Sequence, residues 1–324
     1  MSLDEQRTPV LAVTKTTNRL GEIYYGKILE EVDSFPMGEW APASVVQFCK
    51  YQMGRAATET LFGPQLFELH PHLLDAFWDF EAAVPPLFLG VPRWWNSKPY
   101  KARERYFRMA ETYLASAFDK FEWTTRAETD WDPNFGASIF REMAKWLKDG
   151  GFSDDTAAAA NTNTIPITIW GIMEISREPE LFHALRQEVQ GALVVNTSTG
   201  GKALGIQKLL TMPLLQSVYV ECCVSTWISL EAPMQIAHHD EAVWGVPEHH
   251  ASEFWAHRHI KYVESTDEAG NSKRRPEFSM AGRPSSFFTY GGGLPICPGR
   301  HFAKHEILIS MGLIIAKLGI EYVG

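Results

Sequence analysis

One segment near the end of the chain limits the possible folds more than any other. Residues 302–319, FAKHEILISMGLIIAKLG, are apolar on most faces of a helix. Such a helix must be covered on nearly all sides, because its apolar surface is stable only away from water. Strand signals elsewhere in the chain are weak. The sequence therefore predicts a mainly α fold, with a few short β-strands, in which this helix is deeply buried.

Four further segments have apolar residues at helical intervals: 102–121, 133–150, 153–189 and 212–230. The second is expected to end at Gly150, and Pro179 is expected to break the third and to open the next helix. Residues 264–284 are polar, charged and rich in turn formers, so we expect a surface loop there.

Composition excludes several classes of protein. The chain has 324 residues, of which 45% are hydrophobic, enough for one large domain over residues 1–324 or for two ordinary ones. A net charge of −9 makes nucleic acid an unexpected partner. The first residues do not resemble a signal peptide, and no segment has the length and apolarity of a membrane-spanning helix. Judged on these features alone, the chain would be cytoplasmic.

The four cysteines show no disulfide pattern, and Cys222 and Cys223 are expected to be buried in a helix. Cys297 is different, because it follows three glycines in the stretch TYGGGLPICPGRHFAKHE, residues 289–306. Glycines allow tight turns and close approach of a ligand, and Pro298 suits a first helical turn. Cys297 is then expected at the helix N-cap, where the helix dipole stabilises a thiolate. The alternative is an ordinary glycine turn with a buried cysteine.

The spacing of five residues resembles the haem-binding signature of the cytochrome P450 family: Tyr290, Gly293, Cys297, Gly299 and Ala303. The resemblance implies that the Cys297 thiolate is the axial ligand of a haem iron and that Phe302 packs near the haem. Many members of the family carry a basic residue at the place of Pro295, facing a haem propionate. Arg300 or His301 is the candidate for that role here.

The segment Asn163-Thr164-Ile165-Pro166 lies in a predicted helix, where a proline bends the axis. Taken alone, the segment is typical of a proline-kinked core helix. The family, however, carries an acid or amide followed by threonine above the haem, where the pair handles oxygen and protons. By this resemblance, Asn163 and Thr164 are the catalytic pair. The form Asn-Thr-Ile-Pro resembles the subgroup that contains sterol hydroxylases, prostacyclin synthase and fungal natural-product enzymes.

Two structural residues of the family also have counterparts. Arg258 in EFWAHRH (253–259) matches a structural arginine, and Glu221 matches the glutamate of the family's Glu-x-x-Arg pair. Val224 stands where that pair has its arginine. Either Glu221 and Arg258 each lose a partner, at a cost of a few kcal/mol for an unpaired buried charge, or they pair directly with each other.

The resemblance covers residues 43–320 with gaps, so the chain looks N-terminally truncated and internally shortened. It implies a haem-thiolate monooxygenase that oxidises an apolar small molecule, sterol- or polyketide-like, in secondary metabolite biosynthesis. Electrons would come from NADPH through a cytochrome P450 reductase, on the endoplasmic reticulum membrane. Aromatic residues of 77–95 would wall the substrate pocket, pack in the core or face a membrane.

Two alternatives remain. The first is a non-catalytic, truncated relic of such an enzyme that fails to hold haem. The second is a metal-binding protein, because six histidines occur close together in the sequence and histidine is a common metal ligand: His238, His239, His249, His250, His257 and His259. Their spacing matches no familiar ligand set.

Overall fold

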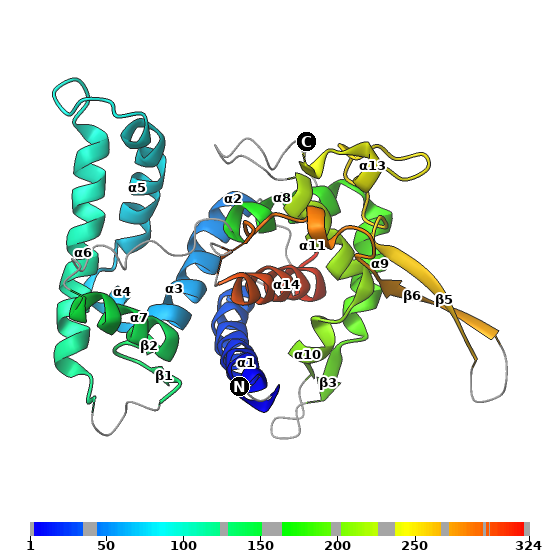
Figure 1. Cartoon of the computed structure of the whole chain (residues 1–324), viewed down its shortest axis with the longest axis horizontal. Coiled ribbons are helices and arrows are strands. Elements are labelled where there is room, and N and C mark those ends of the chain that lie inside the picture. Colours follow the sequence, from blue (N-terminus) through cyan, green and yellow to red (C-terminus); the bar gives the residue numbers. More distant parts are fainter. Residues whose placement is uncertain are drawn as a thin grey trace. The chain divides into compact units, whose positions relative to one another are not determined.

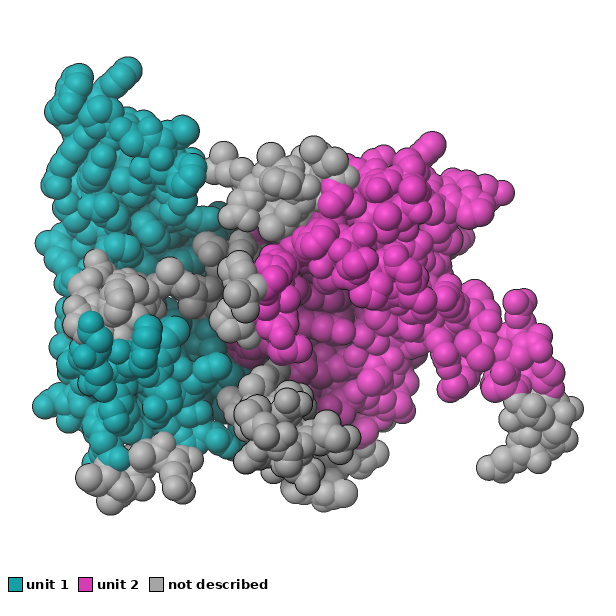
Figure 2. Space-filling view, in the orientation of Figure 1, with its two compact units in different colours: residues 1–31, 46–162 teal, residues 32–45, 163–324 magenta. Residues whose placement is uncertain are grey.

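The computed structural model describes residues 3–34, 44–123, 129–150, 164–195, 202–225, 237–266, 272–293, 296–297 and 299–320. The chain divides into two compact units (Figures 1 and 2). Unit 1 comprises residues 1–31 and 46–162, and unit 2 comprises residues 32–45 and 163–324. Most described residues are helical, and the described strands form three two-stranded antiparallel sheets. The predicted mainly α class is confirmed.

Unit 1 is a helical unit that carries one small hairpin. Its helices include most of α1 (Leu3–Asp33), α2 (Val45–Phe48), a π-helical turn (Cys49–Met53), α3 (Gly54–Phe62), α4 (Gln65–Leu69), α5 (Leu73–Phe88), α6 (Lys98–Lys120) and α7 (Ser138–Asp149). Helix α6 confirms the prediction over 102–121 and begins four residues earlier, where Pro99 occupies the first turn. It packs against α5.

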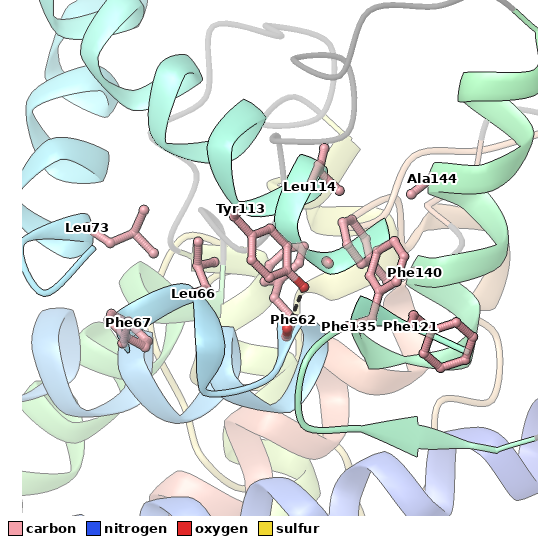
Figure 3. Close-up of a cluster of buried hydrophobic side chains, with 11 residues drawn as sticks. Phe62, Leu66, Phe67, Leu73, Tyr113, Leu114, Phe121, Phe135, Phe140 and Ala144 are labelled. Atoms are coloured by element: carbon pink, nitrogen blue, oxygen red, sulfur yellow. Dashed lines mark hydrogen bonds between the residues drawn. The ribbon is translucent and has the colours of Figure 1, made fainter. Parts of the chain in front are cut away.

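The core of unit 1 is an aromatic cluster that joins α3, α6 and α7 (Figure 3). The rings of Phe62 and Phe140 meet edge to face, with centroids 4.4 Å apart. Tyr113 on α6 donates its hydroxyl hydrogen to the carbonyl of Phe62 at 2.5 Å, so this buried polar atom is paired. Phe135 completes the cluster against Phe118 and Phe121.

The hairpin of β1 (Trp131–Asp132) and β2 (Gly136–Ala137) precedes α7. The predicted helix over 133–150 is therefore wrong in its first five residues. The Asp132 carboxylate accepts hydrogen bonds from the backbone N–H groups of Asn134 and Phe135, which closes a turn in place of a helix. From Ser138 onward the prediction is confirmed, and α7 ends at Gly150 as expected.

Unit 2 is built around α14 (Arg300–Lys317), which packs against α8 (Thr164–Arg177), α9 (Pro179–Gln190), α10 (Ile206–Leu209) and α11 (Pro213–Ser225). All residues from Glu306 to Ile315 are buried, which confirms the expected deep burial. The unit also contains β3 (Leu193–Val195), β4 (Lys202–Leu204), α13 (Glu241–Trp244), β5 (Ile260–Thr266), β6 (Ser272–Phe278) and a short 3-10 turn (Pro284–Ser286).

Other predictions for unit 2 have mixed outcomes. Pro179 opens α9 as predicted, and the helix predicted from residue 212 is present as α11. Residues 153–163 and 226–230 lie outside the described residues. The loop predicted over 264–284 is wrong over 264–266 and 272–278, because β5 and β6 pair in register from Ile260–Phe278 to Thr266–Ser272, whereas 279–283 form no strand or helix. Most side chains of this hairpin are exposed, so its strands lack the alternation of apolar and polar residues that reveals a half-buried strand.

Gly136 offers a direct test of the unit 1 hairpin. Its φ is +67°, and a Cβ there would lie 2.1 Å from the carbonyl oxygen of Leu61, whereas Gly90 has the same φ and nothing within 4 Å of an added Cβ. We expect Gly90→Ala to lower the free energy of unfolding by about 1–2 kcal/mol through backbone strain alone. Gly136→Ala should lower the free energy of unfolding, measured by chemical denaturation, clearly more than Gly90→Ala does. Equal losses in the two variants would show that the backbones do not approach as described.

Candidate functional site

The cysteine loop lies between the 3-10 turn and α14 and is closed by its own backbone. Gly291 and Gly293 have φ of +78° and +68°, the left-handed region that favours glycine. The N–H of Gly291 bonds to the carbonyl of Phe288, and the N–H of Cys297 bonds to the carbonyl of Tyr290, each at 2.8 Å. The glycines thus let the chain turn back so that Cys297 lies beside Tyr290.

Cys297 differs from the other three cysteines in exposure. All four are free, but only Cys297 is exposed. Burial raises the thiol pKa of Cys49 and of Cys223 to about 12, and it also raises that of Cys222. The three buried thiols are therefore inert at neutral pH, and Cys297 is the sulfur that an incoming ligand can reach.

The predicted position of Cys297 at the helix N-cap is wrong. Helix α14 begins at Arg300 and its N-cap is Gly299, so Cys297 lies three residues before the helix. Gly299 already has helical φ and ψ, and its carbonyl accepts the N–H of Ala303 at 2.9 Å. The carbonyl of Cys297 accepts the backbone N–H of Arg300 at 3.4 Å and the guanidinium Nη1 of Arg300 at 3.0 Å. Pro298 lies outside the described residues.

Two residues that the resemblance assigns to the haem site, Gly299 and Phe302, lie at the start of α14. Phe302 is buried in the first turn of α14. A Cβ added at Gly299 would lie 3.7 Å from the Cys297 sulfur, in van der Waals contact, so the glycine brings the backbone close to the sulfur without a side chain between them. Arg300 donates one guanidinium N–H to the Cys297 carbonyl, whereas His301 is exposed. Which of the two basic residues faces a propionate stays a prediction.

Helix α11 holds the loop through two contacts. The hydroxyls of Tyr219 and Tyr290 share a hydrogen bond of 2.8 Å, and the hydroxyl of Thr289 donates to the carbonyl of Cys223 at 3.5 Å. Burial raises the pKa of both tyrosines, so both stay protonated. The ammonium of Lys304 lies 5.6 Å from the ring centroid of Tyr219, which adds a cation–π contact from α14.

On α11, Glu221 forms a second buried network. Its Oε1 accepts from Arg258 Nε at 2.9 Å and lies 3.0 Å from His259 Nε2, and its Oε2 accepts the N–H of Trp255 at 2.9 Å. Of the two arrangements that the sequence left open, the structure shows the direct Glu221–Arg258 pair. Arg258 also donates to three backbone carbonyls, those of Trp244, His250 and Glu253.

The chain is similar to several known proteins. No model of a known protein family matches the chain. The chain is 36% identical over 340 aligned positions to the cytochrome P450 monooxygenase calL of Penicillium decumbens, covering 96% of this chain and 62% of that protein. The chain belongs to the cytochrome P450 family. It is also 27% identical to the cytochrome P450 monooxygenase fsoE of Humicola fuscoatra (87% of this chain, 58% of that protein). The cholesterol 7-alpha-monooxygenase of Cricetulus griseus is 25% identical (88% and 60%). The chain spans about three fifths of the length of these P450 relatives.

The threonine predicted to be catalytic, Thr164, contacts Glu306, a residue to which no sequence motif pointed. Thr164 Oγ1, at the start of α8 as described, donates to Glu306 Oε1 on α14 at 3.0 Å, and both residues are buried. Burial raises the pKa of Glu306 to about 8. Its Oε2 has no hydrogen-bond partner among the described residues. Glu306 is the only acidic residue in the apolar segment 302–319, a signal that could have identified it. Asn163 lies outside the described residues.

The histidines between 238 and 259 do not converge. Within the described residues, which include all six, no group of three metal-ligating side chains forms. His238 Nε2 accepts the N–H of Phe288 just before the cysteine loop, and burial lowers its pKa to about 4. His249 stacks on Trp255, and His259 binds Glu221. The described residues therefore provide no cluster of ligands in support of the metal-binding alternative.

Glu306 should make stability depend on pH. Its folded pKa of about 8 exceeds the ordinary value of 4.5, so the folded chain holds a proton that the unfolded chain has lost between these values. Folding stability supplied by the neutral acid is therefore lost as pH rises from about 4.5 to about 8, by at most ~1.4 kcal/mol per pH unit. Glu306→Gln should remove this slope in denaturation series, whereas exposed Glu264→Gln should keep it. An unchanged slope in Glu306→Gln would contradict the assignment.

Proposed function

We propose that this chain is the haem-binding part of a cytochrome P450 monooxygenase, a single haem-binding domain with Cys297 as the iron ligand. The observation that carries the proposal is the loop geometry. Cys297 is the one exposed cysteine, and it follows glycines in left-handed conformations. A soft sulfur donor with an uncovered side suits iron in a large planar ring.

Several residues would hold the cofactor. A haem bound through a cysteine thiolate supplies the activation of dioxygen that lets one oxygen atom enter an apolar substrate. Cys297 would provide the sulfur, Gly299 would let the ring approach it, and Gly293 would allow the turn that presents it. Tyr290 and Phe302 would form the adjoining wall, because both are largely buried next to the loop. Arg300 would keep the Cys297 carbonyl oriented.

Thr164 and Glu306 would handle protons. Glu306, whose pKa burial raises to about 8, keeps its proton at neutral pH and can release it without a large free-energy cost. The Thr164 hydroxyl already bonds to Glu306 Oε1, so a proton on the carboxyl and one on the hydroxyl lie within a single hydrogen-bond step. Asn163 would act with Thr164. Electrons would come from NADPH through a cytochrome P450 reductase.

The substrate would be an apolar small molecule, sterol- or polyketide-like. A sterol-like substrate is supported by the similarity to a cholesterol 7-alpha-monooxygenase. A polyketide-like substrate is supported by the similarity to P450 monooxygenases of fungi. We place the reaction in secondary metabolite biosynthesis on the same ground. The alternative of a non-catalytic relic remains the outcome if the chain does not hold haem.

The protein would bind to a membrane surface. Among the described residues, no helix has the length and apolarity that crossing a bilayer requires. The end of α5 and the segment after it nevertheless expose Phe88, Leu89, Trp94 and Trp95, with exposed fractions of 74–86%. These side chains do not wall an enclosed pocket. Residues 88–105 carry five basic residues and one acidic residue, in a chain of net charge −9. Indoles beside cationic side chains favour an anionic lipid surface, consistent with the endoplasmic reticulum membrane.

The haem proposal is tested by the carbon monoxide difference spectrum of the reduced, haem-loaded chain. We expect a band typical of a thiolate-ligated haem in the native chain and in Cys49→Ala, and its loss in Cys297→Ala, because only Cys297 is accessible. A chain that retains no haem would support the relic, and a thiolate band that persists in Cys297→Ala would assign the ligand elsewhere. In the haem-competent chain, turnover of an apolar sterol with reductase and NADPH then tests the activity.

The membrane location has its own test in vesicle co-sedimentation. We expect the chain to bind vesicles that contain phosphatidylserine, and the double substitution Trp94→Ala, Trp95→Ala to reduce binding by about tenfold or more, because two indoles leave the interface. Trp146→Ala removes another exposed tryptophan of unit 1 and should leave binding unchanged. Equal binding by both variants would refute the location of the contact.

A further inference from the structure

The buried carboxylate of Glu221 has an unusual second side-chain donor. Val224, which stands where the P450 pattern has an arginine, is buried and has no polar side-chain atom. The Glu221 carboxylate still has two side-chain partners, because His259 Nε2 lies 3.0 Å from Oε1, which also accepts from Arg258. The side chains of Glu221 and His259 are both almost fully buried, so the contact between them is shielded from bulk solvent.

We propose that His259 takes the place of the absent arginine and acts as a positioning residue, which holds α11 in the orientation that the cysteine loop needs. Oε1 of Glu221 only accepts in its ionised form, so the histidine must donate, and its proton lies on Nε2. Nδ1 has no hydrogen-bond partner among the described residues. Burial lowers the pKa of His259, which favours a neutral ring that donates one hydrogen bond.

His259 binds α11 at two points one helical turn apart. Its ring reaches Glu221, and its backbone N–H donates to the hydroxyl of Ser217 at 3.2 Å. Its carbonyl accepts the N–H of Ser279 at 2.8 Å, and its ring meets the Trp244 ring edge to face at 6.0 Å. The ring is therefore fixed on one side by α13 and presents Nε2 to α11.

The cysteine loop lies against the opposite side of α11. Ser217 and Glu221 are four residues apart and share one face of the helix. Tyr219 and Cys223, which bind Tyr290 and Thr289, are also four apart, but they are displaced by two residues, or about 200°. Helix α11 is thus held between the Arg258–His259 segment and the loop of Cys297. Loss of the hydrogen bond between His259 and Glu221 on one face of α11 should therefore loosen the Cys297 loop on the opposite face.

The test uses the haem-free chain of residues 1–324, so its outcome does not depend on the proposed cofactor. His259→Gln places an amide N–H close to the position of Nε2, whereas His259→Asn is of similar polarity but ends near Nδ1. Hydrogen exchange is measured by mass spectrometry over α11 and residues 288–293. We expect native-like protection in His259→Gln and exchange faster by about tenfold or more in His259→Asn, because a hydrogen bond to a charged group is lost. His257→Asn is the neighbouring control.

A rescue variant separates positioning from simple loss of packing. Adding Val224→Arg to His259→Asn places a guanidinium three residues after Glu221, on the same side of the helix. Restored protection of both α11 and the loop would support the proposal. Equal protection in the Gln and Asn variants would overturn it, as would faster exchange confined to β5 and β6 with α11 and the loop unchanged.

Discussion

The hydrogen bonds of the buried Glu221 carboxylate are the interaction on which unit 2 depends. An acidic group in the interior is tolerated only when its oxygens are paired, and an unpaired charge costs a few kcal/mol. Here Arg258, His259 and the backbone of Trp255 meet that requirement. Arg258 extends the network, because its remaining N–H groups bind three carbonyls at the end of α13 and in the segment that follows it. One carboxylate thus joins a central helix to a long irregular segment.

Helix α11 connects this network to the loop that carries Cys297. One of its faces carries Glu221, and another carries Tyr219, whose hydroxyl binds Tyr290 at the base of the cysteine loop. The loop itself has few side chains, so its shape rests on the backbone bonds around Gly291 and on these anchors. An exposed thiol on a loop that is anchored from the core is suited to bind a cofactor and to keep it oriented. In the role that we propose for His259, the chain would present its cysteine without the arginine of the Glu-x-x-Arg pair.

The sequence was informative where the signal was local. The apolar run 302–319 predicted a buried helix, and the glycine and cysteine spacing predicted the exposed thiol. It failed where a feature depended on distant partners or on polar surfaces. The β5–β6 hairpin lacks an apolar face, so nothing distinguished it from a loop, and Asp132 closes a turn that the helical pattern concealed. Glu306 and His259 gain their roles from contacts 142 and 38 residues away, which spacing alone does not reveal.

The central claim is that Cys297 is the accessible sulfur of this chain and the ligand that a haem would take. Alkylation of the native chain with iodoacetamide, mapped by mass spectrometry with and without added haem, tests it directly. The structure predicts labelling at Cys297 alone in the haem-free chain and its protection when haem is bound, with Cys49, Cys222 and Cys223 labelled only after unfolding. Labelling of Cys297 that persists in the haem-bound chain would contradict the account.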